Sequence, residues 1–154
     1  MATSNAAQQA EEEYMEIDTR YGKQMVAKSS LLTFPDGLPG FEELREFKLF
    51  HEEDTENVHF LQSTEDAGIR LPVVAPHSCK IDFRIELSDA ETAKLQIQPE
   101  DDIIVLVTLS ENTEQPEGGI TANLMGPIII NAQSRIGIQK VLNRVDGAVV
   151  IDAN

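Results

Sequence analysis

The stretch IIVLVTL, from Ile103 to Leu109, is among the most apolar in the chain. It is far shorter than the roughly 20 apolar residues that a membrane helix requires. Its Ile and Val residues are typical of β-strands, and its length is that of a strand. We therefore expect a buried strand here, in a chain without a transmembrane segment.

The residues that follow this strand indicate a hairpin. A second apolar run lies at Ile120–Leu124, and the polar segment SENTEQPEGG at 110–119 separates the two. This connection is too long for a two-residue turn, but it is compatible with a hairpin that has a protruding tip. Because the tip carries acidic residues, we consider it either a solvated loop or a contact surface.

Short apolar runs broken by Gly, Pro, Asn and Asp occur along most of the chain, a pattern typical of antiparallel β structure. No alternation of strands with full-length helices appears, which argues against a parallel α/β sheet. We expect a mainly β fold, a single-domain antiparallel β-barrel-like structure with one or two short helices. The runs are FKLFH, VHFLQS, IRLPVVAP, KIDFRIEL, DIIVLVTLS, GITANLM, PIIINA, RIGIQKVL and GAVVIDA.

Local patterns refine this prediction. The segment MEIDTRYGKQMVA alternates around Tyr21-Gly22 as a hairpin would. In LSDAETAKLQI, Ser88 precedes Glu91 by three residues, a capping-box pattern that predicts a short helix. FEELREF is compatible with about one helical turn. Residues 1–13 hold little to bury, so we expect a disordered or frayed acidic tail before a domain at 14–154.

FPDGLPGF, residues 34–41, packs two prolines and two glycines between phenylalanines. It lacks the lysine of a phosphate-binding P-loop and the glycine spacing of a dinucleotide fingerprint. Proline fixes φ, and glycine accepts positive φ, so the segment can bend twice within a few residues. We expect a structural turn whose phenylalanines anchor it in the core. Its structural residues are Phe34, Pro35, Gly37, Pro39, Gly40 and Phe41.

Acidity is the strongest compositional feature, with 27 Asp and Glu against 12 Lys and Arg and a formal net charge of -15. Such a chain is repelled by nucleic-acid phosphates, and it favours encounter with a basic protein. Between Leu95 and Ser134 there are acids but no Lys or Arg. A second acidic cluster lies in HEEDTENVHF. The acids of the longer interval are Glu100, Asp101, Asp102, Glu111, Glu114 and Glu117.

No catalytic or metal-binding constellation is evident in the sequence. Cys79 is the only cysteine, which excludes an intrachain disulfide and a cysteine-based zinc site. The three histidines show no metal-ligand spacing, and nothing in the sequence brings two of them together with a carboxylate. The N-terminus carries acids where a secretory signal would carry positive charge. We expect a cytoplasmic, non-enzymatic protein without cofactor or metal, although an oxidoreductase with an unrecognised flavin site stays an open alternative.

Three motifs, in order, resemble the FliW family of flagellar assembly factors. They are FPDGLPGFEELREF, HFLQSTEDAGIRLPVVAP and ITANLMGPIIINAQSRIGIQKVL, and the resemblance runs from about Ile17 to Asp152. In place of the aromatic or larger apolar residue that many relatives have after the Gln-Ser strand, this chain has Ala67-Gly68-Ile69. Within the last motif we expect structural roles for Asn123, Pro127 and Asn131.

The resemblance implies a partner switch. FliW-like proteins bind CsrA, a small basic RNA-binding translational repressor, and they bind flagellin, which competes for FliW and returns CsrA to its RNA. We expect CsrA and flagellin as partners, with no direct nucleic-acid or membrane contact, and a monomeric chain. For flagellin, an apolar groove that accepts an amphipathic helix is the fitting mode.

Two hypotheses remain open at this level. In the first, CsrA recognition uses Glu100, Asp101 and Asp102, together with the loop acids Glu111, Glu114 and Glu117; the alternative for each acid is that it only ends a strand or solvates a loop. In the second, the protein is a flagellin-specific chaperone that does not act on CsrA. Binding of CsrA should weaken with salt, whereas apolar flagellin binding should be nearly insensitive to it.

Overall fold

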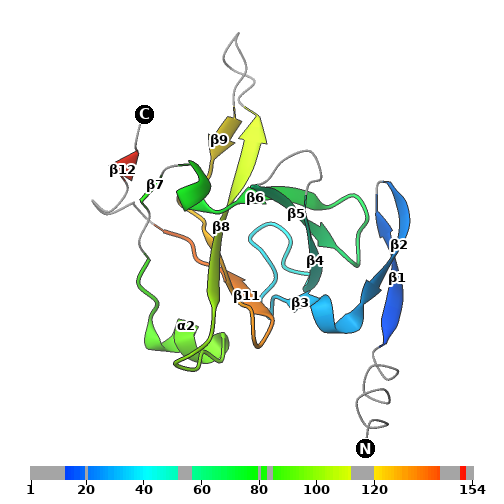
Figure 1. Ribbon diagram of the computed structural model, residues 1–154, viewed down its shortest axis with the longest axis horizontal. Helices are drawn as coiled ribbons and strands as arrows, with labels where there is room; N and C mark the ends of the chain where they lie inside the picture. The colour runs from blue at the N-terminus through cyan, green and yellow to red at the C-terminus, as the bar shows by residue number, and fades with distance from the viewer. Residues whose placement is uncertain are drawn as a thin grey trace, which may run out of the picture.

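A computed structural model describes residues 13–19, 21–51, 57–79, 81–82, 85–111, 120–142 and 150–151. The fold is mainly β, as expected, and Figure 1 shows strands that curve around one another, with the helix α2 at one end. The strands are β1 (Tyr14–Thr19), β2 (Gly22–Ala27), β3 (Leu32–Thr33), β4 (Glu46–His51), β5 (Val58–Ser63), β6 (Arg70–Val74), β7 (Ile81–Asp82), β8 (Ile103–Glu111), β9 (Ile120–Ala122), β10 (Ile128–Asn131), β11 (Ile136–Gln139) and β12 (Val150–Ile151).

The central sheet closes on itself. Its strands follow the order β10-β11-β3-β4-β5-β6-β8, and β10 also pairs with β8, for example at Ile128↔Leu106. Closure leaves no free edges among these strands, so the expected barrel-like fold is confirmed. Pairings are antiparallel except for the parallel bridge between Ile136 of β11 and Thr33 of β3. The predicted hairpin is also present, because β9 pairs with β8.

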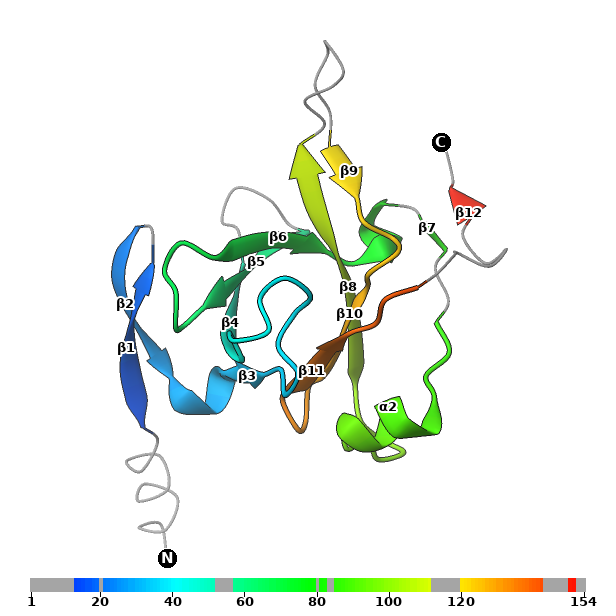
Figure 2. The same ribbon diagram turned by 180° about the vertical axis from the view of Figure 1, so that it is seen from behind.

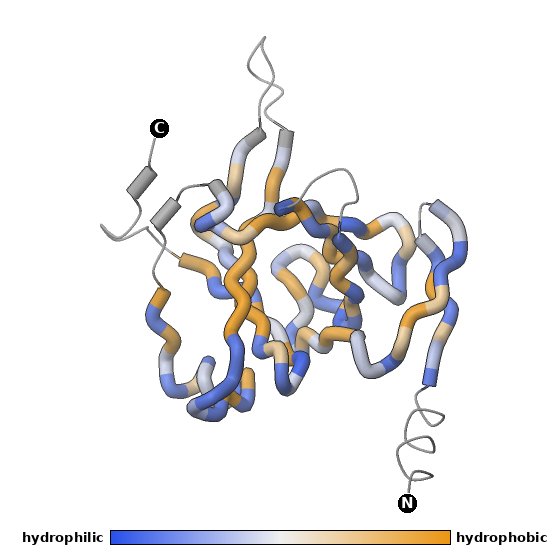
Figure 3. Tube along the Cα trace, in the orientation of Figure 1, coloured by the Kyte–Doolittle hydropathy of each residue, from blue (hydrophilic) through white to orange (hydrophobic). Residues whose placement is uncertain are grey.

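The core fills the inside of this barrel. Leu61, Val73 and Ile130 are buried there, and the fully buried rings of Phe34 and Phe47 meet edge to face at 5.4 Å between centroids. Both faces of β10 are buried, since Ile128 and Ile130 join this core while Ile129 packs with residues of the α2 region. Figure 3 shows the apolar colouring along β8 and the hydrophilic segment that precedes it beside α2.

The expected hairpin at Tyr21-Gly22 is β1–β2, with Gly22 at φ +105° in the turn. Figure 2 shows it beside the barrel, next to β4 and the strands that follow. Its inner residues Ile17 and Val26 are buried in a second core with Leu31, against which Phe50 of β4 packs. The short 3-10 helix η1 (Lys28–Ser30) then leads the chain into β3.

The helix predicted from the capping box is present as α2 (Asp89–Lys94). The Ser88 hydroxyl accepts from Glu91 N at 3.1 Å, and the Glu91 carboxylate accepts from Ser88 N at 2.8 Å. Both bonds satisfy N–H groups that the first helical turn would leave without partners.

Two local expectations were wrong. FEELREF forms a turn, not a helix, because the Glu65 carboxylate accepts from the backbone N–H groups of Arg45 and Glu46 at 3.0 and 2.9 Å, and Glu46 begins β4. Among the described residues of KIDFRIEL, Ile81 and Asp82 form the strand β7, which follows the 3-10 helix η2 (Pro76–Cys79) and pairs with β12, whereas Ile85–Leu87 do not belong to a strand. Within the described ranges, no helix has the length and apolar content that a membrane span requires.

Candidate functional site

An acidic segment at one end of the barrel carries the residues that the sequence singled out first. It runs from Ile85 through α2 to Asp102 and contains six acids and one base, Lys94. Glu86, Asp89, Glu100 and Asp102 are exposed, so their charges face solvent. We call residues 85–102 the acidic segment. Its local field favours a cationic partner.

Asp101 differs from its two neighbours because its carboxylate has a structural role. Its Oδ2 accepts hydrogen bonds from Gln98 N at 2.8 Å and from Asn131 Nδ2 at 3.0 Å. Asn131 is fully buried and also donates to Leu95 O at 3.0 Å. These bonds hold the turn before β8 against the end of β10. Glu100 and Asp102, in contrast, are exposed on this turn.

The other predicted acids are not gathered here. Glu111 ends β8, where it pairs with Ile120. Glu114 and Glu117 lie outside the described residues. The acids at positions 52–56 also lie outside them. The described structure thus places only the Glu100–Asp102 turn of the sequence-predicted acidic patch beside α2.

Glu91 connects α2 to Lys140, the residue that follows β11. Its Oε1 accepts from Lys140 Nζ at 2.7 Å as well as from Ser88 N. Partial burial alone would raise the pKa of this carboxyl, but the hydrogen bonds from Lys140 and Ser88 and the charge of Lys140 lower it below its ordinary value. Glu91 is therefore a charged anchor between the helix and the residue after β11.

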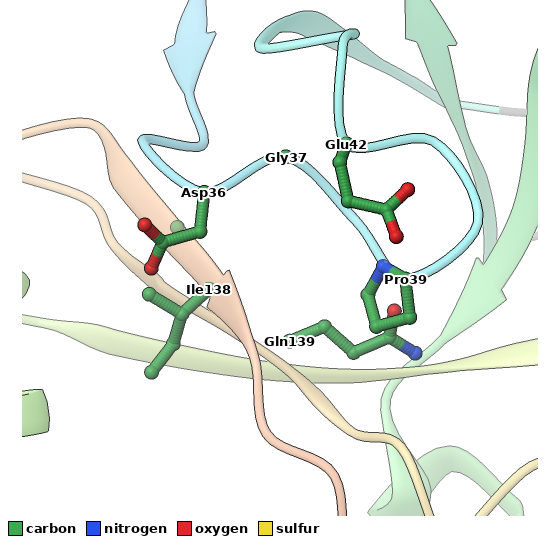
Figure 4. A pocket seen from close by; sticks show the side chains of 7 residues that line it. Asp36, Gly37, Pro39, Glu42, Ile138 and Gln139 are labelled. Carbon is green, nitrogen blue, oxygen red and sulfur yellow. The ribbon is translucent and has the colours of Figure 1, made fainter.

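The FPDGLPGF turn borders a small cavity near this surface. The cavity has a volume of about 220 Å³ and lies between the turn and β11. Figure 4 shows Asp36 and Ile138 on one side of it, and Glu42, Pro39 and Gln139 on the other. Lys94 of α2 forms an ion pair with Asp36, which ties the turn to the acidic segment.

The residues of the turn have the conformations that proline and glycine permit. Gly37 and Gly40 have φ of +67° and +88°. Phe34 is fully buried and Phe41 packs against the main core, so both ends of the bend are anchored. A β-bridge joins Leu38 to Phe41. Of the other predicted structural residues, Pro35 is half-buried, Pro127 is buried and Asn123 is exposed, with Asn123 Oδ1 accepting from Met125 N at 3.1 Å.

The structure brings two histidines together, which the sequence analysis did not anticipate. His51 and His59 are cross-strand partners on β4 and β5, with ring centroids 4.9 Å apart. The register of β4 and β5 brings these two histidines together, and the sequence alone does not determine that register. Among the residues the structure describes, no group of three or more His, Cys, Asp or Glu side chains is arranged to hold a metal ion.

Comparison with known proteins agrees with this fold and sequence. The sequence profile of one family, described as FliW protein, matches residues 16–150. The flagellar assembly factor FliW of Azoarcus sp. (strain BH72) is 35% identical, and the match covers 85% of this chain and 92% of the relative. That of Chromobacterium violaceum is 37% identical, with 81% and 90% covered. A crystal structure of the flagellar assembly factor FliW is 31% identical at a TM-score of 0.75, covering 86% of this chain and 91% of that one.

These similarities place the protein among the flagellar assembly factors, a class of β-barrel assembly proteins rather than enzymes. The chain belongs to the FliW family. The resemblance drawn from the three sequence motifs is thereby confirmed.

Proposed function

We propose that this protein binds and antagonises the translational repressor CsrA and is itself sequestered by flagellin, so that flagellin synthesis follows flagellar assembly. Membership of the FliW family supports this assignment. The observation that carries the CsrA half is the acidic segment, in which six acids face one base and that base, Lys94, is paired with Asp36. A basic RNA-binding protein is the partner that such a surface attracts.

The net charge also determines how the association with CsrA would depend on salt concentration. The net charge of -15 raises the rate of association with a cationic protein, and added salt screens that attraction. The exposed acids Glu100 and Asp102 sit on a turn that Asp101 and Asn131 hold in place. A turn held in this way presents these charges at little cost in backbone ordering.

Calorimetric titration with CsrA at low and moderate salt tests this proposal. The decisive variant is the double change Glu100→Gln/Asp102→Asn, which removes two charges but leaves Asp101 to hold the turn. Its matched control is Asp18→Asn/Glu43→Gln, because both residues are exposed and lie on other elements. We expect the first variant to weaken binding roughly tenfold at low salt and the control by about twofold or less. Equal affinity for the two variants would reject the acidic segment as the CsrA surface.

For flagellin we propose contact through apolar surface. On the outer face of the β1–β2 hairpin, Tyr14 and Met25 are 59% and 63% exposed, which is unusual for such large apolar side chains. The register pairs Tyr14 with Ala27, two residues from Met25, so that the two side chains share one face. The same face also carries Glu16, Asp18 and Lys23, so it suits an amphipathic helix whose apolar stripe is flanked by charged residues.

The flagellin half is tested by titrating flagellin into the preformed complex with CsrA. Release of CsrA supports the switch, and the variant Met25→Ser should reduce flagellin affinity without changing CsrA affinity. Flagellin binding by a protein that shows no CsrA binding at any salt would instead support the dedicated chaperone.

A further inference from the structure

A cavity of about 370 Å³ lies between the tip of the β1–β2 hairpin and the outer face of the barrel. Its size is within the range of sites that hold small ligands or single side chains. It shares no lining residue with the cavity beside the FPDGLPGF turn. None of the described residues that line it is acidic, although the chain contains 27 Asp and Glu.

Arg70 of β6 is the permanently charged residue among the described lining residues, and it is held in a fixed position. Its guanidinium lies 3.4 Å from the centroid of the Phe60 ring and 4.8 Å from that of the Tyr21 ring. In addition, its Nη1 donates to Tyr21 Oη at 3.2 Å. Stacking on aromatic rings and a hydrogen bond together restrict the guanidinium plane. The cavity therefore contains a preorganised cation.

This cation has no anionic partner in the part of the chain that the structure describes. The ion pairs among the described residues do not include Arg70. The nearby acids of the hairpin, Glu16 and Asp18, alternate with Ile17 and Thr19, so they lie on the face that points away from the cavity. Because a guanidinium carries five N–H donors, the bond to Tyr21 leaves donors for a ligand.

The other polar side chains of the cavity add no negative charge. Gln24 and His51 line it, and each of these side chains is able to donate an N–H. Gln62 is fully buried, and its Nε2 is bonded to backbone oxygens, so it forms part of the wall. Arg70 is therefore the group that determines which ligand the cavity accepts.

We propose that this cavity binds a carboxylate, the side chain of an aspartate or glutamate that a protein partner inserts. The two oxygens of a carboxylate match two N–H groups of a guanidinium, and such charge-assisted bonds are about twice as strong as bonds between neutral groups. A hydroxyl or an amide therefore binds less well, and an ammonium group is repelled by Arg70. A phosphate group carries about 1.5 to 2 negative charges at neutral pH, so one guanidinium neutralises it incompletely.

A protein side chain is the favoured source because of where the cavity lies. Tyr21, which contacts Arg70, is 69% exposed, and the outer face of the same hairpin presents Tyr14 and Met25 at 59% and 63%. Large apolar side chains exposed side by side mark a surface for protein contact. A partner that covers this hairpin would have side chains near its tip, where the cavity lies. The proposal adds a contact to those proposed above, and it does not depend on CsrA or flagellin being the partner.

Side-chain NMR of isotopically labelled protein tests the proposal with N-acetylglutamate methylamide, whose single charge is the side-chain carboxylate. N-acetylglutamine methylamide is the matched neutral probe, and sodium chloride at the same ionic strength controls for unspecific effects of salt. We expect saturable shifts of the Arg70 Nε–H and Gln24 NH₂ signals with the glutamate compound alone, at a dissociation constant on the order of 10 mM for so small a ligand. Glutarate and inorganic phosphate identify other sources. Binding of either one roughly tenfold more tightly than the capped glutamate would replace the proposal with a metabolite or a phosphate site.

Variants make the result specific to the guanidinium. Arg70→Met should abolish the shifts of Gln24, and Arg70→Lys, which keeps the charge but lacks the paired donors, should weaken binding roughly tenfold. Arg45→Met is the matched control, because Arg45 is exposed and does not line the cavity, and it should leave the affinity unchanged. His51→Gln keeps an N–H donor and should weaken binding by about twofold at most. Shifts that are equal for the neutral probe, that persist in Arg70→Met, or that never appear would overturn the proposal.

Discussion

Asn131 Nδ2 lies 3.0 Å from Asp101 Oδ2, although the two residues are 30 positions apart in the chain. This bond joins the end of β10 to the turn at the end of the acidic segment. The position of the acidic segment's last turn therefore depends on the buried side-chain amide of Asn131.

We predict that Asn131→Ala destabilises the protein by about 1–2 kcal/mol, because it removes the buried donor to Leu95 O and to the Asp101 carboxylate, which then keep only the bonds from Ser134 Oγ and Gln98 N. Urea denaturation of the purified variant measures this loss. Asn123→Ala is the matched control: Asn123 is exposed, so a change of about 0.5 kcal/mol is expected. Similar losses for both variants would contradict the assigned role of Asn131.

The two glycines of the FPDGLPGF turn should respond differently to alanine. A Cβ at Gly40 would meet nothing within 4 Å, so Gly40→Ala bears only the cost of positive φ, about 1 kcal/mol. A Cβ at Gly37 would lie 2.6 Å from the backbone of Glu42, so Gly37→Ala adds a clash that the turn must open to relieve. Thermal denaturation should rank Gly37→Ala well below Gly40→Ala. A Gly40→Ala variant that keeps its stability but loses partner binding would instead give the turn a direct binding role.

Gly137 and Phe34 show why this turn fits the barrel. A Cβ at Gly137 would lie 2.6 Å from the Phe34 ring, which is fully buried. Gly137→Ala should therefore cost about 1–3 kcal/mol through overpacking. In a double-mutant cycle, Phe34→Leu should relieve part of that cost, so the pair should lose less than the sum of the single variants. Additive losses would mean that the ring is not what the new methyl group meets.

The features that could be predicted from the sequence are those that depend on residues close together in the chain. The strands from β4 to β6, the β1–β2 hairpin and the capping box of α2 each follow from residue types a few positions apart. FEELREF is the exception, because the backbone N–H of Arg45 donates a hydrogen bond to the carboxylate of Glu65, twenty residues further along the chain.

The pairing of strands that are distant in the sequence could not be predicted in the same way. Apolar runs specify strands, but they do not specify that β8 pairs with β10 or that β11 lies parallel to β3. For this reason the cross-strand pairs His51–His59 and Gln62–Arg70 were not foreseen, and neither was the structural role of Asp101. Charge counting located the acidic turn, but it could not separate its exposed acids from the one that holds it together.

Glu91 predicts a dependence of stability on pH. Its pKa in the folded protein is lowered below the ordinary value of 4.5 by the hydrogen bonds from Lys140 and Ser88, which outweigh the effect of burial. A carboxyl whose folded pKa is depressed stabilises the fold fully above its unfolded pKa and loses that contribution as the pH falls through the folded value. Unfolding free energies measured in urea from neutral pH to below 4.5 should therefore fall more steeply for the parent protein than for Glu91→Gln. Lys140→Met should flatten the curve in the same way, and Glu43→Gln, at an exposed site, serves as the control. Parallel curves for the parent and both variants would show that the link between α2 and the residue after β11 contributes nothing to the pH dependence.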